Sequence, residues 1–173
     1  MTSMLSQARS RRATRTAIAV GAVTLGLVAL SACQKPTPVA TLTAGSDSAH
    51  TEAACYKGGE RLGKKDFASC VEKFRADEVR EIKVSEGDNI GFGVEPAISE
   101  NGWQVFVNGQ PALGTFKSTY RTFEADYIFS IAARAAQSQA LPKSANVSIV
   151  EAKESTTSDD EYYGVWHFKV EKK

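Results

Sequence analysis

Residues 80–94 read REIKVSEGDNIGFGV, and this stretch decides the fold class. Apolar side chains at Ile82 and Val84 alternate with charged ones, and the same period of two returns over residues 89–94. Such alternation is typical of β-strands that bury one face. Ser85–Asp88, which lies between the two runs, has the composition of a turn. We therefore predict a β-hairpin here.

Similar alternation continues along the rest of the chain. It predicts further strands at Val39–Ala44, Ser48–Tyr56, Trp103–Val107, Tyr127–Ile131, Val147–Ala152 and Tyr163–Val170. We expect Trp103 and Trp166 to be core aromatics. Ala132–Leu141 is rich in alanine and stops at Pro142, which predicts a short helix. The pattern as a whole predicts an all-β domain over residues 39–173, an immunoglobulin-like antiparallel β-sandwich with a short helical insert.

The first 33 residues have the pattern of an export signal. Four arginines between Arg9 and Arg15 precede Ala17–Leu30, a run without charge. As a helix this run is roughly 21 Å long, short for a bilayer core of about 30 Å. A basic segment followed by a short apolar segment is typical of a signal peptide. Ser10–Arg12 has some features of a twin-arginine signal, so the export route stays open.

The run closes on Leu30-Ser31-Ala32-Cys33, which resembles the bacterial lipobox. The resemblance implies that residues 1–32 are removed and that Cys33 carries a diacylglyceryl group. Residues 33–38 are then a lipidated tether, and two acyl chains give stable membrane attachment. We expect a domain on the extracytoplasmic side of the cell membrane. An ordinary signal peptide followed by a chance cysteine is the alternative.

Removal of residues 1–32 changes the charge of the chain. Four arginines and no acids are lost, which leaves 17 basic and 20 acidic residues, a net charge of −3. Because phosphate backbones are bound by basic surfaces, we expect no nucleic-acid partner.

Two cysteines remain after Cys33. An exported compartment permits Cys55 and Cys70 to form a disulfide, which would close a loop of about 15 residues and stabilise the fold by roughly 3 kcal/mol. Two free thiols or a metal-binding pair are the alternatives. The loop itself, Tyr56–Ser69, is rich in glycine and lysine and is predicted to be a polar excursion.

Several of these features occur together in one known group of proteins. Their order along the chain is the lipobox, the early cysteine pair, the turn Val84-x-x-Gly87-Asp88, the strand Gly102-Trp103-Gln104-Val105 and an aromatic-rich final strand. This order resembles an uncharacterised actinobacterial lipoprotein family, a domain of unknown function, over about residues 30–170. The resemblance implies location and fold and assigns no active site. The alanine-rich segment departs from it.

Titratable candidates are few. The chain has two histidines, His50 and His167. We expect both to be exposed, since His167 alternates with apolar neighbours that face the core. A metal site at His50 with nearby carboxylates is the alternative. Asp159 to Glu161 could bind Ca²⁺, but their spacing lacks the ligand alternation of an EF-hand and favours a solvated loop.

Nucleophiles and surface aromatics are equally sparse. Ser69 stands next to Cys70 and outside any Gly-x-Ser-x-Gly elbow, so nothing indicates a serine hydrolase. Gly91 and Gly93 could admit a ligand, or they allow close packing within the sheet. Four aromatic residues could form a surface for a glycan or a protein, with core membership as the alternative: Phe106, Phe116, Tyr120 and Phe123.

These observations favour a non-catalytic binding or assembly module at the cell envelope. Its expected partners are the membrane, through the lipid, and an envelope protein. We expect no cofactor and no enzymatic activity. A small-ligand or glycan-binding lipoprotein is the first alternative, and an envelope enzyme is the second.

Overall fold

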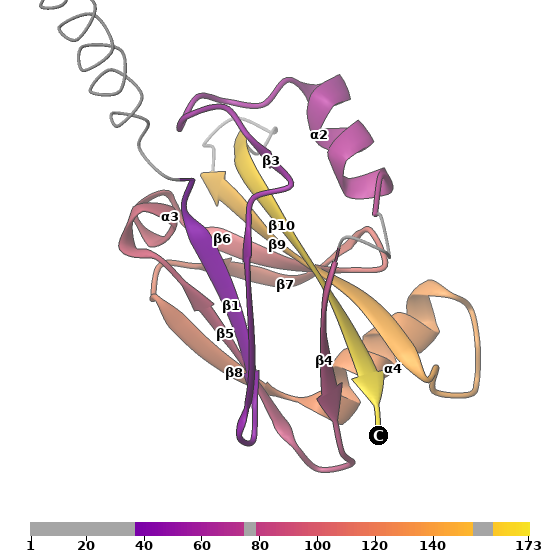
Figure 1. Ribbon diagram of the computed structural model, residues 1–173. Helices are drawn as coiled ribbons and strands as arrows, with labels where there is room; N and C mark the ends of the chain where they lie inside the picture. The colour runs from indigo at the N-terminus through magenta and orange to yellow at the C-terminus, as the bar shows by residue number, and fades with distance from the viewer. Residues whose placement is uncertain (1–36, 75–78, 154–160) are drawn as a thin grey trace, which may run out of the picture. The chain divides into compact units, whose positions relative to one another are not determined.

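The structure is a computed structural model that describes residues 37–74, 79–153 and 161–173 (Figure 1). Cys33, the signal segment and most of the tether lie outside the described residues, as do Asp159 and Asp160. No helix in the described ranges has the length and apolar character needed to cross a membrane. All features below belong to the unit Thr37–Lys173.

One layer is a four-stranded antiparallel sheet, here called sheet A. Its strands are β1 (Val39–Ala44), β2 (Asp47–Glu52), β5 (Asn89–Val94) and β8 (Tyr120–Glu124), in the order β2-β1-β5-β8. Alternate residues of β1 are buried, as the sequence pattern requires. Gly45 takes a positive φ of 57° in the turn between β1 and β2, a conformation that glycine adopts without strain.

The second layer, sheet B, contains the longest strands. Its main path is β3-β10-β9-β6-β7, and β4 also pairs with β10. The bounds are β3 (Cys55–Tyr56), β4 (Arg80–Val84), β6 (Trp103–Val107), β7 (Gln110–Phe116), β9 (Ser144–Lys153) and β10 (Glu161–Lys172). Asn108 and Gly109 join β6 to β7 with positive φ angles of 49° and 78°. Two such residues are typical of a type I′ hairpin turn.

The core lies between the two sheets. Leu42 and Phe92 from sheet A and Trp103 and Trp166 from sheet B are fully buried in one cluster. Helix α4 (Ala125–Ala135) adds buried apolar side chains to the same cluster. The predicted β-sandwich and its two core tryptophans are therefore confirmed. The immunoglobulin-like arrangement of the strands stays a prediction.

The predicted hairpin over residues 80–94 is wrong, although both of its strands exist. β4 pairs in parallel with β10, whereas β5 pairs with β1 and β8. The turn forms, with the amide of Asp88 donating to the carbonyl of Ser85 at 3.2 Å, but it carries the chain from one sheet to the other. A hairpin and such an arch bury the same alternate residues, so a period of two cannot distinguish them.

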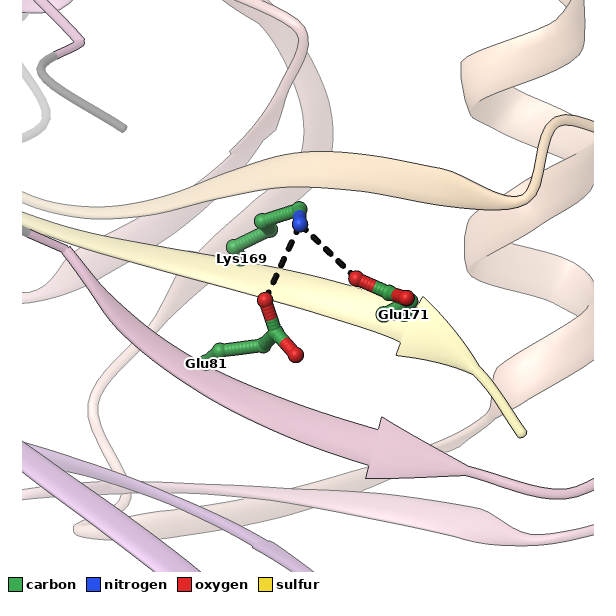
Figure 2. Close-up of polar contacts among 3 residues, drawn as sticks. All are labelled: Glu81, Lys169 and Glu171. Carbon is green, nitrogen blue, oxygen red and sulfur yellow. Dashed lines mark hydrogen bonds and ion pairs between the residues drawn. The ribbon is translucent and has the colours of Figure 1, made fainter. Parts of the chain in front are cut away.

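Ionic contacts reinforce the parallel pair β4–β10. Nζ of Lys169 lies 2.9 Å from Oε2 of Glu81 on β4 and 2.8 Å from Oε2 of Glu171 on its own strand (Figure 2). These hydrogen bonds raise the pKa of Lys169 and lower the pKa of Glu171. Because the groups are open to water, we count them as register-setting contacts with little effect on stability.

The helices differ most from the prediction. The predicted strand Tyr127–Ile131 is wrong, because these residues lie in α4, which ends at Ala135 and not at Leu141. Buried residues of α4 recur with helical spacing, so packing on one face overrides the strand preference of its first half. Two more helices were not predicted: α2 (Lys64–Glu72), which lies in the supposed polar loop, and α3 (Pro96–Asn101), which has proline in its first turn.

Candidate functional site

Helix α2 is fixed against the outer face of sheet B. A disulfide joins Cys55 on β3 to Cys70 on α2 with their Cα atoms 6.2 Å apart, which confirms the predicted pair. Beneath the helix, the side chains of Phe106, Val150 and Val165 are buried with Cys70. The disulfide therefore holds a small second core, separate from the one between the sheets.

Aromatic and ionic contacts also hold the first turns of α2. The ring of Phe67 stacks on Tyr162 of β10 with centroids 3.7 Å apart, and it meets Phe106 edge-on at 6.0 Å. Lys57 donates to Asp66 at 2.7 Å and lowers the pKa of that carboxyl. The ion pair is exposed, so the stacked rings and the disulfide are the main contacts.

A buried serine–histidine pair lies under the C-terminal half of α2. Oγ of Ser148 is 2.8 Å from Nδ1 of His167, and Nε2 of His167 is 3.0 Å from the carbonyl oxygen of Cys70. A carbonyl can only accept, so Nε2 carries the proton and the serine hydroxyl donates to Nδ1. Burial lowers the pKa of His167 and so favours the neutral ring.

The expectation that His167 is exposed is wrong. His167 does alternate with core residues, but α2 covers the face toward which it points, and only 5% of the residue is exposed. The pairing of β9 with β10 then sets Ser148 opposite His167. The sequence contains both residues at outward positions, but their meeting depends on a strand register that no local pattern specifies.

The pair has the atoms of a nucleophile and its base, but its hydrogen bonds differ from those of a catalytic pair. A catalytic histidine is usually oriented by a carboxylate and faces its substrate. Here the second ring nitrogen donates to a helix carbonyl, and both Ser148 and His167 are buried. The arrangement connects α2 to sheet B through one polar chain, so it supports the position of the helix.

An open groove runs along each side of α2. Groove I, between α2 and the β6–β7 hairpin, has a volume of about 410 Å³ and is lined by Phe67, Val71, Phe106, Asn108 and Ser148 among others. Groove II, between α2 and the end of β2, has a volume of about 500 Å³ and is lined by Thr51, Glu52, Cys55, Asp66, Lys73 and His167 among others. Both volumes lie in the range of small-molecule pockets.

The four aromatic residues considered as one surface do not form one. Phe106 is buried under α2. Phe116 packs on Trp103 with ring centroids 5.0 Å apart, and Phe123 packs on the core residue Phe92 at 5.6 Å. Tyr120 alone among the four is exposed, with 51% of its surface accessible.

The side chain of Tyr120 instead accounts for the presence of glycine at two positions of β5. Its side chain crosses β5 from the edge strand β8, and its hydroxyl lies 3.1 Å from Oγ1 of Thr43 on β1. A Cβ atom at Gly91 would collide with this hydroxyl, and one at Gly93 would lie 3.6 Å from the ring. Gly91 and Gly93 therefore provide the close packing considered above, and the space over them is filled by the tyrosine.

Glu151 is a buried acid that the sequence analysis did not single out. It is 3% exposed, and its Oε1 accepts a 2.6 Å hydrogen bond from Nδ2 of Asn101. Its Oε2 has no hydrogen-bond partner among the described residues. Burial raises the pKa of the carboxyl. The signal was present in the sequence, because Glu151 shares the parity of the inward residues Val147 and Ile149.

The remaining candidates are simple to place. His50 is exposed on β2, as expected. No group of three or more histidine, cysteine or acidic residues within the described ranges could hold a metal ion. Glu161 is the described member of the acidic trio, and it pairs with Arg61 at 3.2 Å. Ser69 lies on α2 at groove II.

Comparisons with models of protein families, with curated proteins and with solved structures find no match for the chain.

Proposed function

We propose that this protein is a lipid-anchored, extracytoplasmic binding module that contacts another protein of the cell envelope and performs no catalysis. The lipobox-like segment ending at Cys33 supports the anchor, and so does the resemblance to the actinobacterial lipoprotein family. The location and the partner both follow from that anchor.

The observation that carries the proposal is that the folded domain begins at Thr37, close to Cys33 in the sequence. Nε1 of Trp166 donates to the carbonyl oxygen of Pro38 at 2.8 Å, and Oγ1 of Thr37 donates to Glu52 at 3.1 Å. Thr37 is four residues after Cys33. Four residues span at most about 14 Å, at about 3.5 Å each. A lipid on Cys33 would therefore hold this end of the sandwich close to the membrane surface.

The contacts of the serine–histidine pair support a binding role. His167 donates through Nε2 to the Cys70 carbonyl of α2, its Nδ1 accepts from Ser148 on β9, and the disulfide fixes the same helix. A rigid helix on a rigid sheet presents a pre-organised surface, which reduces the entropy lost on binding.

Lipid attachment is tested first, by mass spectrometry and detergent partition. The native protein should carry a diacylglyceryl group on an N-terminal Cys33 and enter the detergent phase of Triton X-114. Cys33→Ala should keep its first 32 residues and stay unlipidated, whereas Ala32→Gly keeps a small residue before the cysteine and should behave as wild type. A native chain that starts at Met1 and carries no lipid contradicts the anchor.

The partner is tested by chemical cross-linking in intact cells, followed by purification from detergent-solubilised membranes. A specific envelope protein should be recovered with the wild type and lost with Cys33→Ala, because the variant lacks the correct location. Recovery of no protein above an untagged control contradicts the assembly role.

A second candidate function, binding of a small ligand or a glycan, is favoured by two observations. Grooves I and II have volumes of about 410 and 500 Å³, within the range of ligand pockets. Tyr120 presents an exposed ring on an otherwise polar sheet face.

A further inference from the structure

The outer face of sheet A has an unusual chemical composition. Pairing registers place mostly hydroxyl-bearing residues and glycine side by side at its outward positions, together with one histidine: Thr41, Thr43, Ser48, His50, Gly91, Gly93, Tyr120 and Thr122. The helices α2, α3 and α4 lie at the ends of these strands or against sheet B (Figure 1). We call this surface the threonine–tyrosine face.

The aromatic ring on this face is held in place. The hydroxyl of Tyr120 is fixed by Thr43 two strands away, so the side chain lies along the sheet surface. Gly91 lies directly beneath the hydroxyl and Gly93 beneath the ring edge. One side of the ring therefore rests on glycine backbone, while half of the residue remains accessible to solvent.

We propose that the threonine–tyrosine face binds a neutral glycan, a β-1,4-linked pyranose chain, with one sugar ring stacked on Tyr120. The inference rests on the second candidate function above and assigns it a place and a ligand class. A pyranose whose hydroxyls are equatorial has an apolar C–H face that packs on an aromatic ring. Its hydroxyls lie at the rim, where the oxygens of Thr41, Thr43 and Thr122 can exchange hydrogen bonds with them.

The shape and charge of the face favour this ligand over others. A β-1,4-linked chain of such rings is a ribbon, which suits the outer side of a sheet that no helix of the described residues covers. The outward positions of the four strands carry no lysine or arginine, and Glu52 and Glu124 lie at the rim. Arg121 points elsewhere, with its guanidinium over the ring of Phe116 at 5.3 Å. An anionic ligand would therefore be repelled by the two carboxylates and would find no lysine or arginine at the outward strand positions.

A fixed ring makes stacking efficient. Tyrosine offers a large contact area with few rotatable bonds, and the bond to Thr43 removes part of its remaining freedom before the ligand arrives. Tyr120→Phe, which keeps the ring and loses that bond, should therefore weaken binding only slightly.

The test uses the full native protein, purified in a detergent without a sugar head group. Cellotetraose and N-acetylated chitotetraose are the two probes, measured by saturation-transfer NMR and isothermal titration calorimetry. The wild type should bind at least one probe with a Kd below about 1 mM, and Tyr120→Ala should weaken that binding at least about tenfold, the scale of one stacked ring. Tyr120→Phe should stay within about threefold of the wild type.

Tyr127→Ala is the matched control, because Tyr127 is 45% exposed and lies on α4, away from the threonine–tyrosine face. Its binding should equal that of the wild type, and near-ultraviolet circular dichroism should show that each variant is folded. Binding of neither probe overturns the inference. Probe binding that survives Tyr120→Ala also overturns it, but this second result leaves the ligand-binding function in place and moves the site to a groove. Lipidation and partner recovery are measured independently.

Discussion

Glu151 should make the fold less stable as the pH rises. Burial raises the pKa of this carboxyl above its ordinary value of 4.5. The folded state then binds the proton more tightly than the unfolded chain. The stabilisation by the bound proton is fully present below about pH 4.5, and it is lost as the pH rises through the folded pKa.

The magnitude follows from proton linkage. Between the unfolded and the folded pKa, the free energy of unfolding falls by at most about 1.4 kcal/mol per pH unit. Glu151→Gln removes the titration and keeps an oxygen that can accept from Asn101. The stability of the variant relative to the wild type should therefore rise over this window and then become constant. If the side-chain NH₂ group that this substitution introduces finds no hydrogen-bond partner, the variant loses about 1–3 kcal/mol of stability at every pH. The dependence of the stability difference on pH would stay the same.

The assay is urea unfolding at several pH values from 4 to 9, with the disulfide intact. Trp103 and Trp166 are fully buried in the core, so their fluorescence reports unfolding directly. Glu100→Gln is the control, because Glu100 is an exposed acid one residue before Asn101. A difference curve for Glu151→Gln that is flat over the whole range would refute the reasoning. It would show that the carboxyl is not destabilised by burial.

Three further predictions concern the second core and the first residues of the domain. Replacing Cys55 and Cys70 together by alanine should cost roughly 3 kcal/mol in urea unfolding and increase amide hydrogen exchange in α2; unchanged exchange would show that the disulfide does not hold the helix. His167→Gln should abolish a loss of stability that the wild type shows as the pH falls below about 6.5, since its lowered pKa makes the folded state resist protonation; identical pH profiles would contradict this. Trp166→Phe should cost about 1–3 kcal/mol through the lost hydrogen bond to Pro38, and full stability in thermal unfolding would remove that contact from the argument.

Local patterns predicted the sheet layers well. The strands Val39–Ala44 and Trp103–Val107 have the predicted bounds, and both core tryptophans are buried. β1 buries one face, whereas all five residues of β6 are buried, but in both strands the residues that face the main core recur with a period of two. The disulfide was also predictable, from the number of cysteines and the expectation that the chain is exported.

Partner choice between strands was not predictable in the same way. The stretch 80–94 has the alternation and the turn of a hairpin, yet β4 and β5 enter different sheets. The helix over Ala125–Ala135 likewise begins in residues that favour strands, and its inward face is set by contacts with both sheets. Strand partners and the packing of a helix depend on residues far away in the chain. A local period of two or of 3.6 carries no information about those residues.

For the candidate sites too, local patterns predicted the direction of a side chain but not the distant elements that cover it. Alternation placed His167 on the outer face of its strand correctly, but exposure depended on α2, which is tied there by a disulfide. The sequence did not indicate that Tyr120 would be exposed and Phe106 buried, because both residues lie in aromatic-rich strands. The orphaned oxygen of Glu151 required the position of Asn101 in α3.

The place of β10 in sheet B has a consequence for how the newly made chain must fold. This last strand pairs with β9 on one side and with β3 and β4 on the other, and its Trp166 binds Pro38 from 128 residues away. Contacts so distant in sequence are slow to form. Until the final dozen residues are synthesised, β3 and β4 lack the strand with which they pair. The incomplete chain therefore exposes unpaired strand edges. A nonsense mutation anywhere before Glu161 would leave an aggregation-prone fragment instead of a smaller sandwich.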